Sequence, residues 1–516
     1  MTRKENDEIL KAENRAHPNR EISESSVNIA QKAAGGIFWT YVSFAGSKLL
    51  VFVSTVVLAR LLIPAEFGQV AFALLVISYL ETVGDFGVSS ALIYERDDKE
   101  EAANAAFVIS LATSALWFAV VFFAAPLVAD FFNEQSVVPI LRTMAWVFPI
   151  NALGNVHDAL LRKELHFRKK LAPDFASALI KGSISIALAY LGWGVWSLVW
   201  GQIAGSLIST VALWFVIDWR PTLKTSKRVT RRMFSYGGKI VSVNIVSAIV
   251  HDADFVVVGR MLGSVMLGLY SIAYRIPEMG ITMIIWVIGK VTFPVYAKLR
   301  DDQPALRAAF LATLRYLSLL TVPAGIGLAL LAEPFVKVLF GENWRGAVPA
   351  MQALAVAGCL RSLGSHAGDI YKATGRPDIL VKLGVARAVV LVPAMIWAAR
   401  YGIEGVAVAQ IFVTALSTAA NLFIAGNMLS VSVWRLLAEF RSAVLGSVLM
   451  GVALYVFSGI LAAHTSVPET AALITLIFSG MVIYVACIFV FNREIIEQVW
   501  ALATSSLKRK EAGAER

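Results

Sequence analysis

Several basic side chains lie deep within long apolar stretches of the sequence, where lysine and arginine are rare. They are Lys48, Lys181, Arg275, Lys290 and Arg361. If these stretches cross a membrane, each cation costs several kcal/mol when it faces lipid, so we expect each to face a protein interior or a water-filled cavity. Cations in such a cavity favour an anionic ligand such as a phosphate or an acidic sugar. Pairing with buried acids is the structural alternative.

Acidic residues are fewer within the apolar stretches. Glu81 and Asp85 are four residues apart and therefore share one helical face, which makes them candidates for a proton or sodium site. Glu278 lies three residues after Arg275, with Pro277 between them, so an internal ion pair beside a kink competes with a role in ion coupling. Asp254, near the end of another apolar stretch, completes the candidates for ion coupling.

The composition identifies the class of protein. Of the 516 residues, 58% are apolar and 16% are charged, and the mean hydropathy is +0.69. A soluble chain carries about 25% charged residues, so the composition excludes a soluble globular protein, a disordered chain and a nucleic-acid binder. The two cysteines, Cys359 and Cys487, lie in apolar stretches and imply no disulfide framework. The sequence predicts an all-α integral membrane protein.

Apolar stretches of about 20 residues recur often enough to predict about 14 transmembrane helices. Basic residues in the predicted loops account for the net charge of +10. Most of these lysines and arginines lie in loops on the same side of the membrane as the N-terminus. The loops on the opposite side hold only Arg60, Arg260, Lys337, Arg345 and Arg400. Because positive loops stay in the cytoplasm, both termini are expected to be cytoplasmic.

An internal repeat organises these helices. Val57–Leu62 followed by Gly68 recurs 200 residues later as Val257–Leu262 followed by Gly268, and Gln202-Ile203 recurs as Gln410-Ile411. Six predicted helices separate the copies, so the two halves insert in the same orientation, as in alternating-access carriers. The predicted organisation begins with a polar tail (1–34), an N-lobe (35–220) and a basic linker (221–235). It continues with a C-lobe (236–430), two further helices (431–492) and a C-terminal tail (493–516).

Signatures of an enzyme are missing from the sequence. No G-x-x-x-x-G-K-[ST] motif is present, and no His/Cys or His/Glu spacing suggests zinc. We expect no catalytic residue, no metal ligand and no cofactor.

The sequence resembles the polysaccharide exporter family, which contains the Wzx O-antigen and colanic-acid flippases of the multidrug/oligosaccharidyl-lipid/polysaccharide superfamily. The similar segments cover about residues 30–430, and the clearest are Ala59–Gly68, Asp85-Phe86-Gly87-Val88, Asp252–Arg260 and Leu267–Arg275.

The resemblance implies a flippase in the bacterial cytoplasmic membrane that moves an undecaprenyl-pyrophosphate-linked oligosaccharide for exopolysaccharide, capsule or lipopolysaccharide assembly. It implies a central cavity lined by the first, second, seventh and eighth helices, which carry Lys48, Glu81, Asp85, Asn244, Asp254, Arg275 and Lys290. Lys181 and Arg361 are candidates from depth alone. Expected partners are membrane lipids and a polysaccharide polymerase with its co-polymerase, and no nucleic acid. A multidrug or small-metabolite antiporter, or a scaffold of a glycan-assembly complex, is the alternative.

Overall fold

The computed structural model describes residues 45–84, 87–94, 99–222, 225–226, 228–233, 252–463 and 468–491. Within these ranges the chain is helical and has no strand. Ten stretches of the described residues are long and apolar enough to cross a membrane. Two of them, Ala253–Leu299 and Asp378–Met428, are 47 and 51 residues long, about twice the length of one crossing. The predicted all-α membrane fold is confirmed, and the predicted total of 14 helices is compatible with it.

The chain forms two compact units. Unit 1 comprises residues 1–58, 76–126 and 138–246, and unit 2 comprises 59–75, 127–137 and 247–516. Unit 2 therefore contains two short segments from the first half of the sequence. The helices of the first half are one over residues 45–61, then α3 (Pro64–Gly84), α4 (Val88–Tyr94), α5 (Lys99–Phe132), α6 (Val137–Met144), α7 (Val147–Lys163), α8 (Phe167–Tyr190) and α9 (Val195–Val216).

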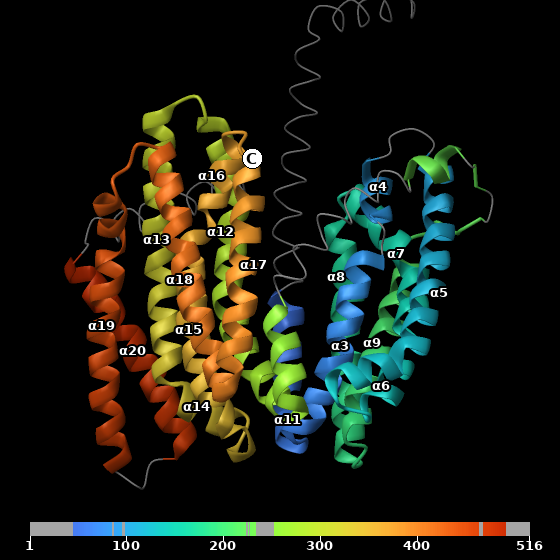
Figure 1. Ribbon diagram of the computed structural model, residues 1–516, viewed down its shortest axis with the longest axis horizontal. Coiled ribbons are helices and arrows are strands. Elements are labelled where there is room, and N and C mark those ends of the chain that lie inside the picture. Colours follow the sequence, from blue (N-terminus) through green and yellow to red (C-terminus); the bar gives the residue numbers. More distant parts are fainter. Residues whose placement is uncertain are drawn as a thin grey trace, which may run out of the picture. The chain divides into compact units, whose positions relative to one another are not determined.

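The second half continues with a longer series of helices (Figure 1). They are α11 (Ala253–Pro277), the π-helix η1 (Glu278–Thr282), α12 (Met283–Leu299), α13 (Gln303–Leu330), α14 (Ala332–Leu339), the 3₁₀-helix η2 (Glu342–Ala347), α15 (Val348–Ser365), α16 (Ala367–Ala373), α17 (Asp378–Ala398), η3 (Ala399–Tyr401), α18 (Gly402–Met428), α19 (Val433–Ala463) and α20 (Glu469–Phe491).

Closely packed helix pairs supply much of the packing, some of them adjacent in the sequence and others not. In unit 1, α8 and α9 run side by side (Figure 1) and approach closely because Gly201 and Gly205 bring the backbone of α9 against Ser185 and Lys181 of α8. In unit 2, α15 packs on α18, where Gly364 contacts Thr418. The hydrophobic effect does not drive helix association in lipid. Close van der Waals packing at small residues stabilises such crossings instead.

The last two helices pack on α13. Arg315 of α13 forms an ion pair with Glu439 of α19 at 2.6 Å, and the Tyr484 hydroxyl of α20 donates to the Leu319 carbonyl at 2.8 Å. At the start of α20, Glu469 accepts from Lys337 of α14 at 2.6 Å. The hydrogen bond and the charge of Glu469, together with Glu342, raise the pKa of Lys337.

Candidate functional site

An arginine from α15 holds the turn that separates α11 from α12. Arg361 donates from one terminal nitrogen to Glu278 at 2.6 Å and to Thr282 at 3.2 Å, and it reaches the Tyr274 hydroxyl at 3.5 Å. Glu278 and Thr282 are the first and last residues of the π-helix η1, which follows Pro277. Proline removes a backbone donor, and π-turns concentrate at functional sites. Arg361 therefore ties together both ends of an irregular turn within unit 2.

Glu278 has an ion-pair partner that spacing along the sequence does not indicate. The sequence suggested Arg275, three residues away, and the structure joins Glu278 to Arg361 of α15. The π-helix changes the register after Pro277, so spacing along a regular α-helix does not decide which side chains meet. Arg275 is half-buried and has interactions of its own.

A second acid of unit 2 is fully enclosed by neutral donors. The Asp254 side chain is 1% exposed. One of its carboxylate oxygens accepts from the Tyr270 hydroxyl at 2.9 Å and from the Gln410 amide at 3.1 Å, and the other accepts from the Phe255 backbone at 3.0 Å. These bonds satisfy a carboxylate that burial would otherwise penalise. Sequence reasoning did not select Tyr270, Tyr274 or Gln410 as site residues, although Gln410 was visible in the repeat.

The Arg361–Glu278 pair and the donors to Asp254 border one small pocket. Its lining includes Tyr274, Glu278, Arg361, Arg387 and Gln410, which come from α11, η1, α15, α17 and α18. About 20 Å³ of free volume remains between these side chains, roughly what one water molecule occupies. This interior of unit 2 is therefore a packed polar network and has no room for a sugar or a pyrophosphate.

Lys290 lies farther along the same part of the chain, on α12. Its ammonium group sits over the Trp286 ring at 3.7 Å from the ring centre. A cation over an indole face is stabilised electrostatically, and indole faces also stack on sugar rings. Since η1 lies between α11 and α12, Arg275 and Lys290 are not joined by an uninterrupted α-helix.

In unit 1 the predicted charges are held by amides. Asn151 of α7 donates to Glu81 at 2.8 Å, and Lys181 of α8 donates to the Gln202 side chain of α9. Lys48 lies on the exposed face of the helix over 45–61. Asp85 and Asn244 lie outside the described residues.

A third set of contacts in unit 2 joins the two copies of the repeated motif. At Gly68 of α3 a side chain would overlap the Ser264 carbonyl of α11, and at Gly268 of α11 it would overlap the Pro64 carbonyl. The Trp344 indole donates to the Ala59 carbonyl at 2.7 Å, and its ring packs edge-on against Phe67 with 5.0 Å between ring centres. These backbone contacts require glycine at both positions.

The two arginines of the motif extend the same interface. Arg60 donates to the carbonyls of Val338 and Leu339 at the end of α14. With the Asn133 amide oriented so that its oxygen faces Arg260, the guanidinium group donates to that oxygen, and it lies over the Phe131 ring beside the end of α5. Each arginine thus binds the end of a helix that belongs to the other half of the sequence.

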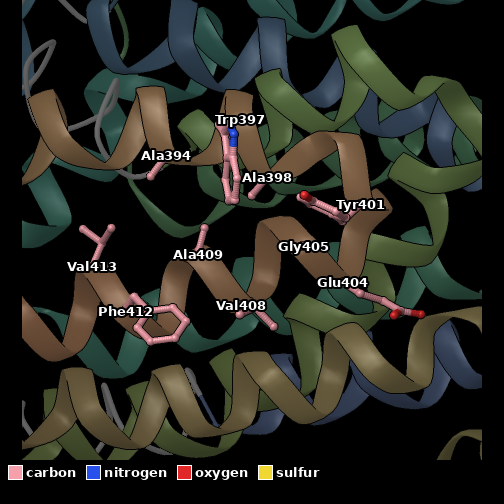
Figure 2. Close-up of a pocket in the computed structure, with 10 residues that line it drawn as sticks. All are labelled: Ala394, Trp397, Ala398, Tyr401, Glu404, Gly405, Val408, Ala409, Phe412 and Val413. Carbon is pink, nitrogen blue, oxygen red and sulfur yellow. The ribbon is translucent and has the colours of Figure 1, made fainter.

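An apolar groove lies between α17 and α18 (Figure 2). It has a volume of about 530 Å³, with Trp397, Tyr401 and Phe412 exposed along it and Glu404 at one end. Apolar exposed surface of this kind is what lipid covers in a membrane protein. No group of three His, Cys, Asp or Glu residues within the described ranges could hold a metal ion.

A family profile described as polysaccharide biosynthesis protein matches residues 57–349. The chain belongs to this family. The match spans both copies of the repeated motif together with Asp254, Tyr274 and Glu278, whereas Arg361, Arg387 and Gln410 lie beyond its end.

Several characterised proteins are similar to the chain over most of its length. The lipopolysaccharide biosynthesis protein WzxC of Escherichia coli K12 is 25% identical over 77% of this chain and 82% of its own length. The succinoglycan biosynthesis transport protein ExoT of Rhizobium meliloti is 28% identical over 71% and 77%. The teichuronic acid biosynthesis protein TuaB of Bacillus subtilis is 26% identical over 68% and 73%.

Two solved structures share the fold. The lipid II flippase MurJ in an inward closed conformation superposes with a TM-score of 0.72, over 89% of this chain and 99% of MurJ, at 15% identity. A multidrug resistance MATE family transporter in an inward-facing conformation gives 0.62 over 76% and 98%, at 16% identity. At such low identity these likenesses establish the shared fold alone.

Proposed function

We propose that the chain is a flippase that moves a polyprenyl-pyrophosphate-linked oligosaccharide across the cytoplasmic membrane for polysaccharide assembly. The observation that carries this proposal is family membership together with long similarity to ExoT and WzxC, which are named for polysaccharide transport and lipopolysaccharide biosynthesis. The fold shared with a protein named as a lipid II flippase supports it. The protein acts as a carrier and not as an enzyme.

The physical requirement is the transfer of a charged, hydrated head group while its lipid tail stays in the bilayer. Lys48, Arg275 and Lys290 supply the cations that a pyrophosphate needs. Lys290 with Trp286 adds an indole face suited to a sugar ring. Lys181 contributes a further cation in unit 1, and Asn244 is retained as a polar contact. Arg361 acts at the π-turn through Glu278 rather than as a direct ligand.

Coupling to an ion gradient is assigned to Glu81 and Asp85. The Asn151 amide beside Glu81 can serve both the charged and the protonated carboxyl group. Asp254 and Glu278 are weaker coupling groups, since Asp254 is enclosed by protein donors and Glu278 is neutralised by Arg361. A double Glu81→Gln/Asp85→Asn variant that exports normally would reject the assignment.

The proposed orientation places both termini in the cytoplasm, with the repeated Arg60 and Arg260 on the opposite side. A polysaccharide polymerase and its co-polymerase are the expected partners on that side, where the flipped units become available.

The test is deletion of the gene in its own host, followed by complementation. Loss of surface polysaccharide with accumulation of the lipid-linked repeat unit inside the cell is the expected phenotype. Lys290→Ala should fail to restore export, whereas Lys298→Ala, an exposed lysine of the same helix, should restore it. Undiminished surface polysaccharide in the deletion strain, or drug sensitivity as its only phenotype, would contradict the proposal.

A further inference from the structure

The repeated motif of the two halves meets itself in space. Pro64 and Gly68 of the first copy correspond to Ser264 and Gly268 of the second at the same offset of 200 residues. Gly68 lies against Ser264, and Gly268 lies against Pro64. The contact is therefore reciprocal, as in a two-fold symmetric interface. A reciprocal fit between equivalent positions requires both copies of the motif to be placed against each other.

Residues next to these glycines also contact the other half of the sequence in a reciprocal way. Arg60 binds the end of α14 in the second half, and Arg260 binds the region at the end of α5 in the first half. Next to each arginine, Ala59 lies against Trp344 from the second half, and Gly259 lies against Phe132 from the first. Four pairs of equivalent positions, 59/259, 60/260, 64/264 and 68/268, thus contact residues from the other half of the sequence.

We propose that these residues form a clasp that holds one end of the carrier closed and parts during each transport cycle. The clasp consists of Ala59, Arg60, Gly68, Gly259, Arg260 and Gly268 with their partners. The inference deepens the proposed flippase function, because it names the residues that control one gate. By the predicted orientation, this gate faces away from the cytoplasm.

The chemistry of the clasp suits reversible contact. The arginine head groups bind backbone carbonyls, an amide oxygen and an aromatic ring, and both arginines are exposed. When the interface parts, no carboxylate in the part of the chain that the structure describes loses a counter-ion, and each guanidinium group returns to water, so opening avoids the penalty of an unpaired buried charge. The terminal carbonyls of α14 lack helical partners and can likewise bind water.

The glycines give the clasp its fit. A methyl group at position 68 or 268 would strike a backbone carbonyl, which cannot move aside as a flexible side chain can. Overpacking of this kind disfavours the closed arrangement without removing any polar contact. Gly68→Ala and Gly268→Ala should therefore shift the protein toward the open clasp, and by similar amounts because their contacts are reciprocal.

Cysteine labelling measures this shift without any substrate. Ala59 is 2% exposed in the closed clasp, so Ala59→Cys, in a chain with Cys359 and Cys487 replaced by alanine, should react slowly with a membrane-impermeant maleimide. Adding Gly268→Ala or Gly68→Ala should raise the labelling rate about tenfold or more. Gly384→Ala is the matched control, since a side chain there meets open space within helix α17, and it should leave the rate unchanged.

An unchanged rate in both glycine variants would overturn the clasp. If either glycine variant fails to fold, Arg60→Gln/Arg260→Gln replaces it with the same expected increase, and an unchanged rate would again overturn the proposal.

Release during transport has its own test. Arg60→Cys/Leu339→Cys, in the same cysteine-free chain, is joined by a reducible bifunctional reagent, and export is compared before linking, after linking and after reduction. Export that stops on linking and returns on reduction supports a clasp that must part. Continued export by the linked protein overturns it. The cysteine-free chain with Arg60 and Leu339 in place is the baseline: its failure to export, with the labelling result intact, would count against the flippase function and not against the clasp.

Discussion

Unit 2 uses arginine in two contrasting ways. In the clasp, Arg60 and Arg260 are exposed and bind carbonyls, an amide and an aromatic ring. In the interior network, Arg361 is paired with Glu278 at 2.6 Å and also reaches Thr282 and Tyr274. The described contacts of the first arrangement involve no acid, so separating them strands no carboxylate, whereas breaking the second leaves the Glu278 carboxylate without Arg361.

The difference indicates which parts of the carrier move against each other and which move together. Separating a contact in every cycle costs little free energy when its polar groups can return to water. A contact that holds α15 on the π-turn should persist through the cycle, because Arg361 and Glu278 neutralise each other. The arginine network is therefore part of a rigid body, and the clasp is a boundary that opens.

The largest effect is expected from breaking the network. Arg361→Gln removes the counter-ion of Glu278, which should lower the free energy of unfolding by about 3–5 kcal/mol because the carboxylate is left uncompensated. Unfolding of the purified protein in bicelles measures this change. The double variant Arg361→Gln/Glu278→Gln should recover part of the loss.

The exposed pair of Arg345 and Glu333 is the matched control for that prediction. Its partners are 2.9 Å apart but 70% and 58% exposed. Arg345→Gln should cost less than about 1 kcal/mol. Equal losses for Arg361→Gln and Arg345→Gln would show that the network is not a structural ion pair.

A smaller loss is expected at the enclosed acid of the network. Gln410→Leu removes one of the three donors to Asp254 while keeping a similar side-chain volume. A hydrogen bond to a charged group contributes about 1.5–3 kcal/mol, so unfolding should become easier by that amount. Leu473→Met, a volume-conserving change in α20, provides the comparison, and a loss no greater than its own would contradict this role of Gln410.

The clasp should respond more weakly to the loss of a single polar contact. Trp344→Phe keeps an aromatic ring against Phe67 but removes the indole donor to the Ala59 carbonyl. We expect the free energy of closing to change by about 1 kcal/mol. Labelling of a cysteine at position 59 should accordingly rise severalfold. A rate equal to that of the unchanged chain would remove this hydrogen bond from the clasp.

The smallest effect concerns the exposed link between α14 and α20. Because Glu469 raises the pKa of Lys337, the stabilisation by this pair is present at neutral pH and is lost as the pH rises through the raised pKa. Lys337→Gln should therefore lower thermal stability slightly at neutral pH, and its curve should meet that of the unchanged chain in the alkaline range. A constant difference across that range would contradict the assignment.

Much of the fold could be predicted from the sequence. Apolar stretches predicted the membrane class, and the repeated motif indicated two related halves. The motif did not reveal that Gly68 and Gly268 contact each other's helices, because nothing in a repeat states where its copies meet. Depth within the apolar stretches selected Arg361 as a cation of interest, but it could not distinguish a substrate ligand from the half-buried ion pair with Glu278.

Other features depended on tertiary partners that the sequence does not place side by side. The partner of Glu278 comes from α15, because the π-turn changes the register that the Arg275 spacing assumed. Asn151, Gln202 and Gln410 hold predicted charges, yet neutral amides in apolar helices give little signal by themselves. Gln202 and Gln410 occupy equivalent positions in the repeat, and this equivalence was the available clue.

The central claim is that the chain carries a lipid-linked glycan from one leaflet to the other. Its most direct test is reconstitution into liposomes that contain a polyprenyl-pyrophosphate-linked oligosaccharide from the host, with the amount in the outer leaflet followed by an impermeant glycosidase. The account predicts rapid exposure with the complete chain and a strongly reduced rate with Lys290→Ala. Exposure no faster than in protein-free liposomes, with the protein folded, would contradict it.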